Sequence, residues 1–370
     1  MIASAPQRPT VLVMGGGYGG VNVAKELDEH AHVVLVEPKD AFQHNVAALR
    51  ALVDPTWPSR IFLPYDHLLA NGTFVRDRAV QVDADRVLLA SGRRLSSTFL
   101  VLATGSTYPF PAKTDRLDAA DAVAHYHSVH GNLAQAGRVM LLGAGAVGLE
   151  LAGEIAAAWP DKHIVLVDLA DEILPGPYDQ RLRDELNSQL DDLGVERVLG
   201  SPLTHLPHTA PCELKSFATA TTAGARIEAD IWFRCHGVAP VTDYLAGDLE
   251  AARTRDGYVD VTPQLKVIGF DHVYAVGDIA AIDANKAGVA ARQADIVATN
   301  IKASITGGEL VTYTPRPPAI ILPLGPTGGA GQLPDHDGIA TADLVAQVKG
   351  RDMMIDRYAQ LLNAAAQVPR

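Results

Sequence analysis

A glycine-rich segment near the start of the chain has the residue types and spacing that bind a dinucleotide. It follows the pattern G-x-G-x-x-G through Gly15, Gly17 and Gly20, and Glu37 stands 17 residues after Gly20. The first glycine allows a tight turn, the second lets the backbone approach a pyrophosphate, and the third lets a helix pack closely on a strand. The N-terminus of that helix faces the phosphates, and the carboxylate accepts hydrogen bonds from the ribose hydroxyls.

A second copy of the same pattern follows 128 residues later, from Gly15 to Gly143. Here Gly143, Gly145 and Gly148 occupy the glycine positions, and Asp168 provides the carboxylate. A carboxylate at this position repels a 2′-phosphate, so we expect NADH rather than NADPH at this site. Two copies in one chain predict two dinucleotide sites.

The elements that position these turns can be read from the apolar pattern. Each glycine segment follows an apolar run and precedes a helical stretch and a second apolar run, which together make a βαβ unit. In the first unit we expect a strand at 11–14, a helix at 21–27 and a second strand at 33–36. In the second unit we expect a strand at 139–142, a helix at 149–158 and a second strand at 164–167.

The remaining expected elements surround these two units. Short strands are expected at 80–85 and 86–89, and two buried strands at 99–103 and 272–276. Leucines at helical spacing predict a helix over 178–193, which Gly194 ends, and a helix over 288–304 ends at Gly307. Further strands are expected at 195–199, 213–222, 227–233 and 319–324, before a final helix whose apolar face carries Met354, Tyr358, Leu361, Leu362 and Ala365.

Composition limits the class of protein. The chain has 370 residues, 48% apolar and 20% charged, which is enough for two or three globular domains. The net charge of −12 disfavours nucleic acid or an anionic membrane as a partner, although a local basic patch could override it. No run of about 18 apolar residues is present, and the first ten residues lack a signal-peptide pattern. We therefore expect a cytoplasmic protein.

Two dinucleotide sites suggest a tightly held flavin and an exchangeable nicotinamide, because hydride passes between these two cofactors. The first unit is supplemented far along the chain by Gly277 and Asp278, which end a buried strand. Asp278 could accept a hydrogen bond from the ribityl chain, while Gly277 lets the backbone close on the phosphate. We therefore assign non-covalent FAD to the first unit and NADH to the second.

The order of four motifs resembles a known superfamily. The two glycine patterns, the segment Ala103-Thr104-Gly105 and the Gly277-Asp278 pair match the flavoproteins with two dinucleotide-binding domains, the pyridine nucleotide-disulfide oxidoreductases. The resemblance covers essentially the whole chain. It implies an α/β fold with two Rossmann-like domains and a small C-terminal α+β domain. The expected FAD domain is 1–110 with 240–306, the NADH domain is 111–239, and the C-terminal domain is 307–370.

Two further segments are similar to one branch of this superfamily. These are Asp40 to Arg50, which reads DAFQHNVAALR, and Lys349-Gly-Arg-Asp352. Both look like the ferroptosis-suppressor and apoptosis-inducing-factor-like branch of NAD(P)H:quinone reductases, which are related to type II NADH dehydrogenases. The lack of a C-x-x-C pair favours this branch over the disulfide reductases, because Cys212 and Cys235 are the only cysteines. A cysteine at position 235 is expected to be a buried small residue, and His236 replaces the threonine usual in the superfamily.

The resemblance implies three residues near the reacting atoms. Glu150 would hold the nicotinamide, His44 would face the flavin near the acceptor pocket, and Lys286 would stand beside the isoalloxazine. Each also has a plainer interpretation. Glu150 could interact only with the helix dipole, His44 could make a structural hydrogen bond, and Lys286 could be a solvated loop lysine. Thr104 and Gly105 are counted among the cofactor-binding residues.

No metal site is expected, because His125, His127 and His130 lack the i, i+4 spacing of a zinc pair on a helix. The function expected from the sequence is FAD-dependent NADH oxidation with a quinone-type acceptor. The alternatives are reduction of a rubredoxin or ferredoxin, and a redox-sensing flavoprotein that acts through partner binding. The apolar face of the final helix could contact the inner face of a membrane peripherally or dock on its own domain. The oligomeric state stays open.

Overall fold

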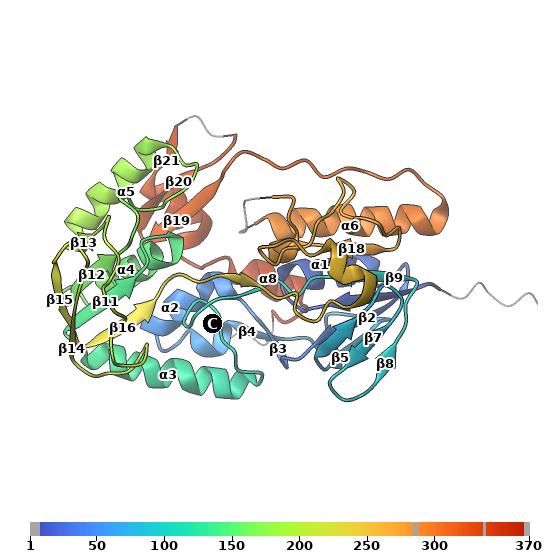
Figure 1. Cartoon of the computed structure of the whole chain (residues 1–370), viewed down its shortest axis with the longest axis horizontal. Coiled ribbons are helices and arrows are strands. Elements are labelled where there is room, and N and C mark those ends of the chain that lie inside the picture. The colour runs from blue at the N-terminus through green and yellow to red at the C-terminus, as the bar shows by residue number, and fades with distance from the viewer. Residues whose placement is uncertain (1–7, 284–287, 336–337, 366–370) are drawn as a thin grey trace, which may run out of the picture.

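Two parallel-sheet units lie side by side, and the last part of the chain packs over both (Figure 1). The computed structural model describes residues 8–283, 288–335 and 338–365. The α/β architecture expected from the sequence is confirmed. No helix within these residues is long and apolar enough to cross a membrane.

The first unit is built on a five-stranded parallel sheet in the order β18-β9-β1-β2-β5. Its strands come from distant parts of the chain, and they are β1 (Thr10–Met14), β2 (His32–Glu37), β5 (Thr73–Arg76), β9 (Phe99–Leu102) and β18 (Val273–Ala275). They read as continuous apolar runs because both faces of the sheet are covered. Helices α1 (Tyr18–Leu27) and α6 (Val289–Thr306) cover one face, and the small antiparallel sheet of β6 (Ala79–Val82), β7 (Val87–Leu89) and β8 (Arg94–Leu95) packs against the other.

The second unit repeats the plan with four parallel strands in the order β13-β12-β11-β16. The strands are β11 (Arg138–Leu142), β12 (His163–Val167), β13 (Glu196–Val198) and β16 (Ile231–Arg234). Helix α4 (Ala146–Ala158) covers one face, together with α3 (Ala119–Gln135) and α5 (Gln180–Asp192). The hairpin of β14 (Phe217–Ala220) and β15 (Arg226–Ala229) covers the other face.

The chain crosses between the units twice, and the crossings pair with each other. Strand β10 (Ser106–Thr107) on the way out lies antiparallel to β17 (Ala239–Pro240) on the way back. On the first unit, β3 (Ala41–Gln43) pairs with β4 (Phe62–Pro64), and helix α2 (Ala48–Val53) packs against α4 of the second unit. The carboxyl ends of both sheets therefore lie close to the junction.

The C-terminal part contacts both units. Strands β19 (Ile320–Leu324), β20 (Gly328–Gln332) and β21 (Ile339–Ala340) form an antiparallel sheet. Strand β19 lies so close to α4 that a Cβ on Gly153 would overlap the backbone of Leu324. Helix α7 (Ala342–Val345), a π-helical turn (Ala346–Gly350) and helix α8 (Ile355–Leu361) then lead back to the first unit, where Tyr358 stacks on Phe42.

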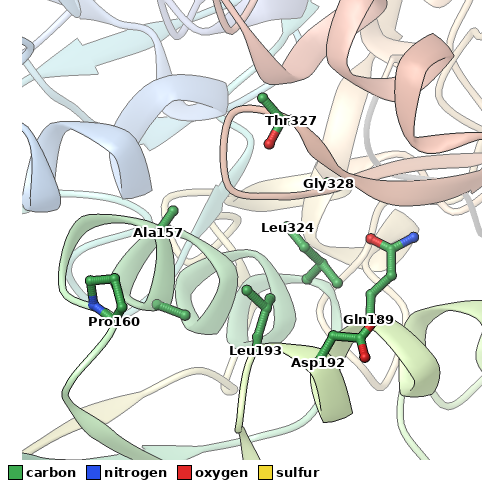
Figure 2. Close-up of a pocket in the computed structure, with 9 residues that line it drawn as sticks. Ala157, Pro160, Gln189, Asp192, Leu193, Leu324, Thr327 and Gly328 are labelled. Carbon is green, nitrogen blue, oxygen red and sulfur yellow. The ribbon is translucent and has the colours of Figure 1, made fainter.

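The hairpin β19–β20 leaves a cavity of about 490 Å³ against the second unit (Figure 2). Ala157 and Pro160 from the end of α4, Asp192 and Leu193 from the end of α5, and Thr327 from the hairpin turn contribute to its walls. This end of α4 is the opposite one from the Gly143–Gly148 turn. The cavity is therefore separate from the dinucleotide sites and marks the edge where the C-terminal sheet docks.

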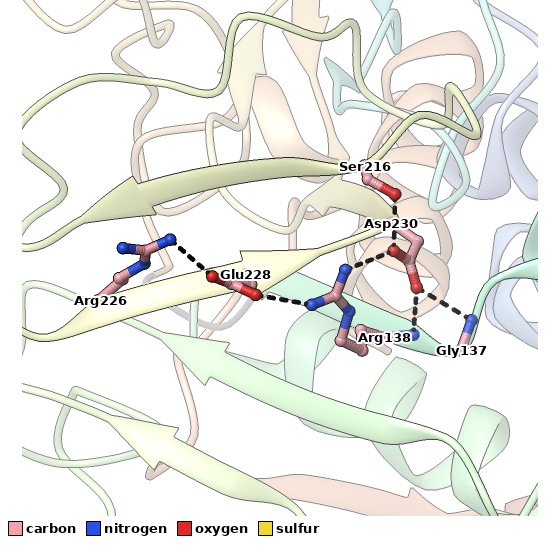
Figure 3. Close-up of polar contacts among 6 residues, drawn as sticks. All are labelled: Gly137, Arg138, Ser216, Arg226, Glu228 and Asp230. Atoms are coloured by element: carbon pink, nitrogen blue, oxygen red, sulfur yellow. Dashed lines mark hydrogen bonds and ion pairs between the residues drawn. The ribbon is translucent and has the colours of Figure 1, made fainter.

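The sequence-based expectation of one strand over 227–233 is wrong, because Asp230 divides it into β15 and β16. Figure 3 shows the reason. The Asp230 carboxylate accepts hydrogen bonds from the backbone N–H groups of Gly137 and Arg138 and from the Ser216 hydroxyl, and it pairs with the Arg138 guanidinium at 2.9 Å. The chain turns at this carboxylate, which joins the hairpin to the amino end of β11.

Three further elements differ from the expectations. The final helix is shorter than expected, because Met353 and Met354 adopt left-handed φ values of 51° and 59° before α8 and the helix ends at Leu361, so Ala365 lies beyond it and is exposed. Helix α3 was not expected, although its buried residues Ala122, Tyr126, Val129 and Leu133 recur at helical spacing. The expected strand over 213–222 is shortened to β14.

Candidate functional site

The first glycine turn, which we call the first cradle, lies at the carboxyl end of β1. Gly15 has a φ of +103°, and a Cβ there would stand 2.5 Å from the Ala103 carbonyl oxygen. A Cβ on Gly20 would overlap the Gly15 carbonyl, whereas a Cβ on Gly17 would meet no atom within 4 Å. Gly15 and Gly20 are therefore required by the fold, and Gly17 leaves open space in front of the α1 N-terminus, as a bound phosphate requires.

Glu37 holds this turn from the end of β2. One carboxylate oxygen accepts the N–H of Gly16 at 2.7 Å, and the other accepts the N–H of Lys39 at 3.0 Å. The Tyr65 hydroxyl donates to the Gly16 carbonyl at 2.8 Å. The carboxylate predicted to bind a ribose thus stands directly beside the glycine turn.

The second turn repeats this geometry. Gly143 has a φ of +122°, a Cβ on Gly148 would overlap the Gly143 carbonyl, and a Cβ on Gly145 would meet nothing within 4 Å. One oxygen of Asp168 accepts the N–H of Ala144 at 2.6 Å, as Glu37 does for Gly16. Helices α1 and α4 both begin after a glycine with a φ of −77° and without a side-chain cap. Their first N–H groups are therefore left for a ligand.

Gly277 and Asp278 follow β18, at the same sheet edge as the first cradle. The Gly277 N–H donates to the Gln293 side chain on α6 at 2.7 Å. The Asp278 carboxylate accepts from the Ser106 hydroxyl and pairs with Lys113 at 3.3 Å. The sequence analysis did not find Lys113, which has no motif around it and comes from the linker after β10.

Thr104 connects the two crossings between the units. Its hydroxyl donates to the Val241 carbonyl at 2.6 Å and shares a hydrogen bond with the Tyr244 hydroxyl at 2.8 Å. Gly105 is left-handed, with a φ of +66°, and its carbonyl accepts the Val241 N–H. The Thr104 side chain is thus engaged by the linker, and cofactor binding by this residue stays a prediction.

Glu150 belongs to an ion-pair network between α4 and the C-terminal part. Its carboxylate is 2.6 Å from the ammonium of Lys349, in the π-helical turn. One turn further along α4, Glu154 pairs with Arg50 of α2, with a second contact of 2.8 Å. Arg50 also donates to the Gly350 carbonyl at 2.9 Å. Two segments that the sequence analysis singled out, 40–50 and 349–352, are thereby joined through α4.

This network is shielded from water. The side chains of Arg50 and Glu154 are 7% and 2% exposed, and those of Lys349 and Glu150 are 15% and 13% exposed. Burial raises the pKa of both glutamates, and the positive charges of Lys349 and Arg50 act in the opposite direction. The sequence analysis missed Arg50 and Glu154 as a pair. The available signal was the spacing of four residues between Glu150 and Glu154, which places both on one helix face.

His44 is fully buried at the junction of α2 and the C-terminal part. Its Nε2–H donates to the Met353 carbonyl at 2.6 Å, so Nδ1 accepts from the Tyr18 hydroxyl at 3.0 Å. The ring lies among Tyr18, Phe42 and Tyr358. Burial lowers its pKa to about 4, so the imidazole is neutral at pH 7. Both ring nitrogens are engaged, and a role for His44 beside the flavin stays a prediction.

The cysteines do not form a pair beside the first cradle. Cys235 lies at the end of β16, where its carbonyl oxygen would be 2.9 Å from a Cβ on Gly143, and Cys212 lies in the preceding loop of the same unit. Burial raises the pKa of both thiols, that of Cys212 to about 12. Both thiols are protonated at neutral pH. Lys286, the remaining expected site residue, lies outside the described residues.

The apolar face expected on the final helix docks on the protein itself. Tyr358 stacks in the ring cluster around His44, and Leu362 is fully buried. Ile355 and Ala359 share this covered face. This favours the docked alternative, because membrane contact through the same face would require α8 to leave its site.

Comparison with known proteins identifies the family. Residues 9–295 match the family described as Pyridine nucleotide-disulphide oxidoreductase. The chain belongs to this family. It is 32% identical over 359 residues to ferroptosis suppressor protein 1 of Taeniopygia guttata, with 94% of each chain covered. It is 28% identical over 378 residues to apoptosis-inducing factor homolog B of Dictyostelium discoideum, covering 96% of this chain and 97% of that one.

Solved structures of other oxidoreductases share the fold. An NAD-dependent persulfide reductase from A. fulgidus superimposes with a TM-score of 0.68 and 17% identity, over 84% of this chain and 61% of that one. The water-forming NADH oxidase of Lactobacillus brevis, bound to NADH, superimposes with a TM-score of 0.64 and 20% identity, over 82% of this chain and 71% of that one.

As a pyridine nucleotide-disulphide oxidoreductase, the protein is a pyridine nucleotide-dependent flavoprotein whose cofactors are FAD and NADH. The two cradles fit these dinucleotides, because Gly17 and Gly145 both leave open space at a helix N-terminus beside a carboxylate.

Proposed function

We propose that this protein is an FAD-dependent NADH oxidoreductase that delivers two electrons to a quinone-type acceptor. Bound FAD supplies the chemistry, since it accepts hydride from a nicotinamide and releases electrons to a second substrate. The protein contributes binding, orientation and exclusion of water. The first cradle would hold FAD through Gly15, Gly17 and Glu37, with Gly277 and Asp278 closing on it. The second cradle would hold NADH.

The placement of the cysteines carries this proposal. A disulfide-reducing member of the family needs a dithiol near its flavin, and the two cysteines of this chain lie in the second unit, outside the elements that form the first cradle. Their thiols are kept protonated by burial. Electrons must therefore pass from the flavin directly to the acceptor. The resemblance of segments 40–50 and 349–352 to the quinone-reductase branch supports a quinone as that acceptor.

The role that we propose for Glu150 is to orient the nicotinamide. It stands in the second turn of α4, five residues after Gly145, and Lys349 fixes its carboxylate at 2.6 Å. A carboxylate held in this way can accept a hydrogen bond from the carboxamide N–H₂ or a ribose hydroxyl. Correct placement of the reacting atoms contributes strongly to rate. Arg50, from α2 of the first unit, braces the same helix through its ion pair with Glu154.

Steady-state NADH oxidation with a short-chain quinone tests the proposal. We expect the FAD-loaded protein to turn over rapidly with quinone alone. Turnover that appears only after an iron–sulfur protein is added would instead support a protein acceptor. No turnover with either acceptor, together with slow reduction of the flavin by NADH, would support the redox-sensing alternative.

A further inference from the structure

Arg50 connects three parts of the chain through one side chain. It belongs to α2 of the first unit, which packs against α4 of the second unit (Figure 1). Its Nε and Nη2 groups donate to the two carboxylate oxygens of Glu154 on α4, and Nη2 also donates to the Gly350 carbonyl of the C-terminal part at 2.9 Å. The guanidinium lies 5.6 Å from the centre of the Trp57 ring. This set of contacts requires the planar fork of donors that arginine has and lysine lacks.

The Gly350 carbonyl that Arg50 binds belongs to the residue next to Lys349. Both Lys349 and Gly350 lie in the π-helical turn, and the Lys349 ammonium is 2.6 Å from the Glu150 carboxylate. A Cβ on Gly350 would stand 2.9 Å from the Pro326 carbonyl oxygen, so the turn is packed closely against the β19–β20 hairpin. The lysine stem is flexible, and the position of its ammonium depends on where the backbone is held. Arg50 therefore holds the backbone from which Lys349 reaches Glu150.

The two glutamates of α4 compete for positive charge. Glu150 and Glu154 are four residues apart and share one helix face. Burial raises the pKa of Glu154, and the positive charges of Arg50 and Lys349 both lower it. Burial also raises the pKa of Glu150, while Lys349 lowers it and the negative charge of Glu154 raises it. Lys349 therefore acts on both carboxylates, and neutralisation of Glu154 by Arg50 leaves Lys349 to pair with Glu150.

We propose that Arg50, a residue of the first unit, is a positioning residue for the nicotinamide that binds to the second unit. It keeps Lys349 on Glu150 in two ways, because it neutralises Glu154 and holds the Gly350 carbonyl. The Glu150 carboxylate then keeps one orientation toward the nicotinamide, and the rate of flavin reduction depends on that placement. This inference rests on the role of Glu150 in the proposed function and is independent of the electron acceptor.

A double-mutant cycle between Arg50 and Glu150 tests the proposal in the FAD-loaded protein. Anaerobic stopped-flow absorbance measures the limiting rate of flavin reduction by NADH, and titration calorimetry measures the NAD⁺ dissociation constant. We expect Arg50→Met to slow reduction about 10-fold and to change NAD⁺ affinity less than about 3-fold, because the nicotinamide is misplaced rather than released. In the Glu150→Gln background, Arg50→Met should slow reduction by less than about 2-fold further, since residues in one network are not additive. Arg50→Lys, which keeps the charge but loses the planar fork, should give an intermediate rate.

A second variant separates positioning from stability, because Arg50→Met alone leaves Glu154 buried without its partner. Arg50→Met/Glu154→Leu removes both charges and should unfold in urea at a midpoint close to that of the wild type. It should still slow flavin reduction by about 3-fold or more, because the Gly350 carbonyl has lost its donor. Arg60→Met, which removes the other arginine that stacks on Trp57, is the matched control and should be reduced at the wild-type rate.

A wild-type rate of flavin reduction in Arg50→Met/Glu154→Leu would overturn the proposal. Equal slowing by Arg50→Met in the wild-type and Glu150→Gln backgrounds would overturn it too, because Arg50 would then not act through Glu150. The same holds if Arg50→Met slows reduction and Glu150→Gln does not. Failure of the quinone to reoxidise the flavin, with the cycle as expected, would bear only on the acceptor in the proposed function.

Discussion

At the scale of single residues, Glu150 is the side chain that we expect to affect only one half-reaction. Glu150→Gln keeps the size of the residue but removes the charge that pairs with Lys349 at 2.6 Å. We predict that flavin reduction by NADH slows by about 10-fold to 100-fold, because a small misplacement of the nicotinamide is costly. Reoxidation by quinone should change much less. Anaerobic stopped-flow absorbance of the flavin measures both rates.

Glu250→Gln, an exposed carboxylate of the first unit, serves as the control for this substitution. Equal slowing of reduction and reoxidation by Glu150→Gln would remove Glu150 from the nicotinamide site.

The buried pair of Arg50 and Glu154 gives a stability prediction. Arg50→Met leaves the Glu154 carboxylate buried without its partner, and we expect a loss of about 3–5 kcal/mol in the free energy of unfolding. The double variant Arg50→Met/Glu154→Leu should recover most of this loss, since no charge then stays unpaired. Urea unfolding of the wild type, the two single variants Arg50→Met and Glu154→Leu, and the double variant gives a double-mutant cycle for this pair.

Arg76→Met breaks the exposed ion pair with Asp118 and should leave stability nearly unchanged. If the double Arg50/Glu154 variant were no more stable than the single variant, the buried pair would not explain the loss.

The positions of Glu37 and Asp168 beside the glycine turns could be predicted from the sequence, but these ion pairs could not. Glu37 and Asp168 each come at the end of the first apolar run after a glycine motif, so the local sequence is enough to find them. Arg50 and Glu154 are 104 residues apart, and Lys349 is 199 residues from Glu150. Their pairing depends on how α2, α4 and the C-terminal part pack, which no local pattern encodes.

At the scale of elements, a single added methyl group in each cradle should affect one dinucleotide and not the other. Gly17→Ala and Gly145→Ala place a Cβ where no atom lies within 4 Å, so both variants should fold normally. The added carbon then occupies the space into which a phosphate must come. We predict that Gly17→Ala lowers the FAD content of the purified protein, and that Gly145→Ala keeps FAD but weakens NAD⁺ binding about 10-fold or more.

Absorbance of the bound flavin and NAD⁺ titration measure these two effects. Gly20→Ala and Gly148→Ala are the comparison, because their Cβ atoms would overlap backbone carbonyls and should disturb folding itself. The assignment of the cradles would be wrong if Gly145→Ala lost FAD and Gly17→Ala kept it.

The joint between β11, β15 and β16 gives a pH prediction. Hydrogen bonding to Arg138 is the largest cause that lowers the pKa of Asp230, to about 2. Because the folded pKa lies below the unfolded value of about 4, the stabilisation is complete above about pH 4 and disappears as the pH falls toward 2. Asp230→Asn should therefore lose up to about 1 kcal/mol at pH 7, a small value because the carboxylate is partly solvated.

Urea unfolding at several pH values between 7 and 3 checks this. The difference between wild type and Asp230→Asn should shrink as the solution becomes more acidic than about pH 4. If the difference in the free energy of unfolding between wild type and Asp230→Asn grew in acid, the ionised form of Asp230 would not be the form that stabilises the fold.

The elements themselves were predictable where a motif and an apolar period agree. The βαβ turns, the helix over 180–192 and the strand 320–324 follow directly from glycine placement and hydrophobic spacing. The break at Asp230 depends on its contacts with Gly137 and Arg138, which lie more than 90 residues away. The interruption at Met353 and Met354 accompanies the docking of that segment on His44, so it reflects tertiary contacts rather than local preference.

At the scale of the whole molecule, the C-terminal part connects the two dinucleotide units. It pairs with α4 through Lys349, with α2 through the Gly350 carbonyl, and with His44 through the Met353 carbonyl. The two cradles are therefore held in one arrangement by contacts that lie between them. Such a brace suits a reaction in which two cofactors must meet at a fixed distance.

The most direct test of the account is a sequential stopped-flow experiment on the cysteine-free variant Cys212→Ser/Cys235→Ala. Serine has nearly the size of cysteine, and alanine removes the sulfur at the buried position 235 without adding a polar group. We predict that anaerobic NADH bleaches the flavin and that a short-chain quinone then restores its absorbance, both at rates close to those of the wild type. Failure of the quinone to reoxidise the flavin in a variant that still binds FAD and NAD⁺ would contradict direct transfer from flavin to quinone.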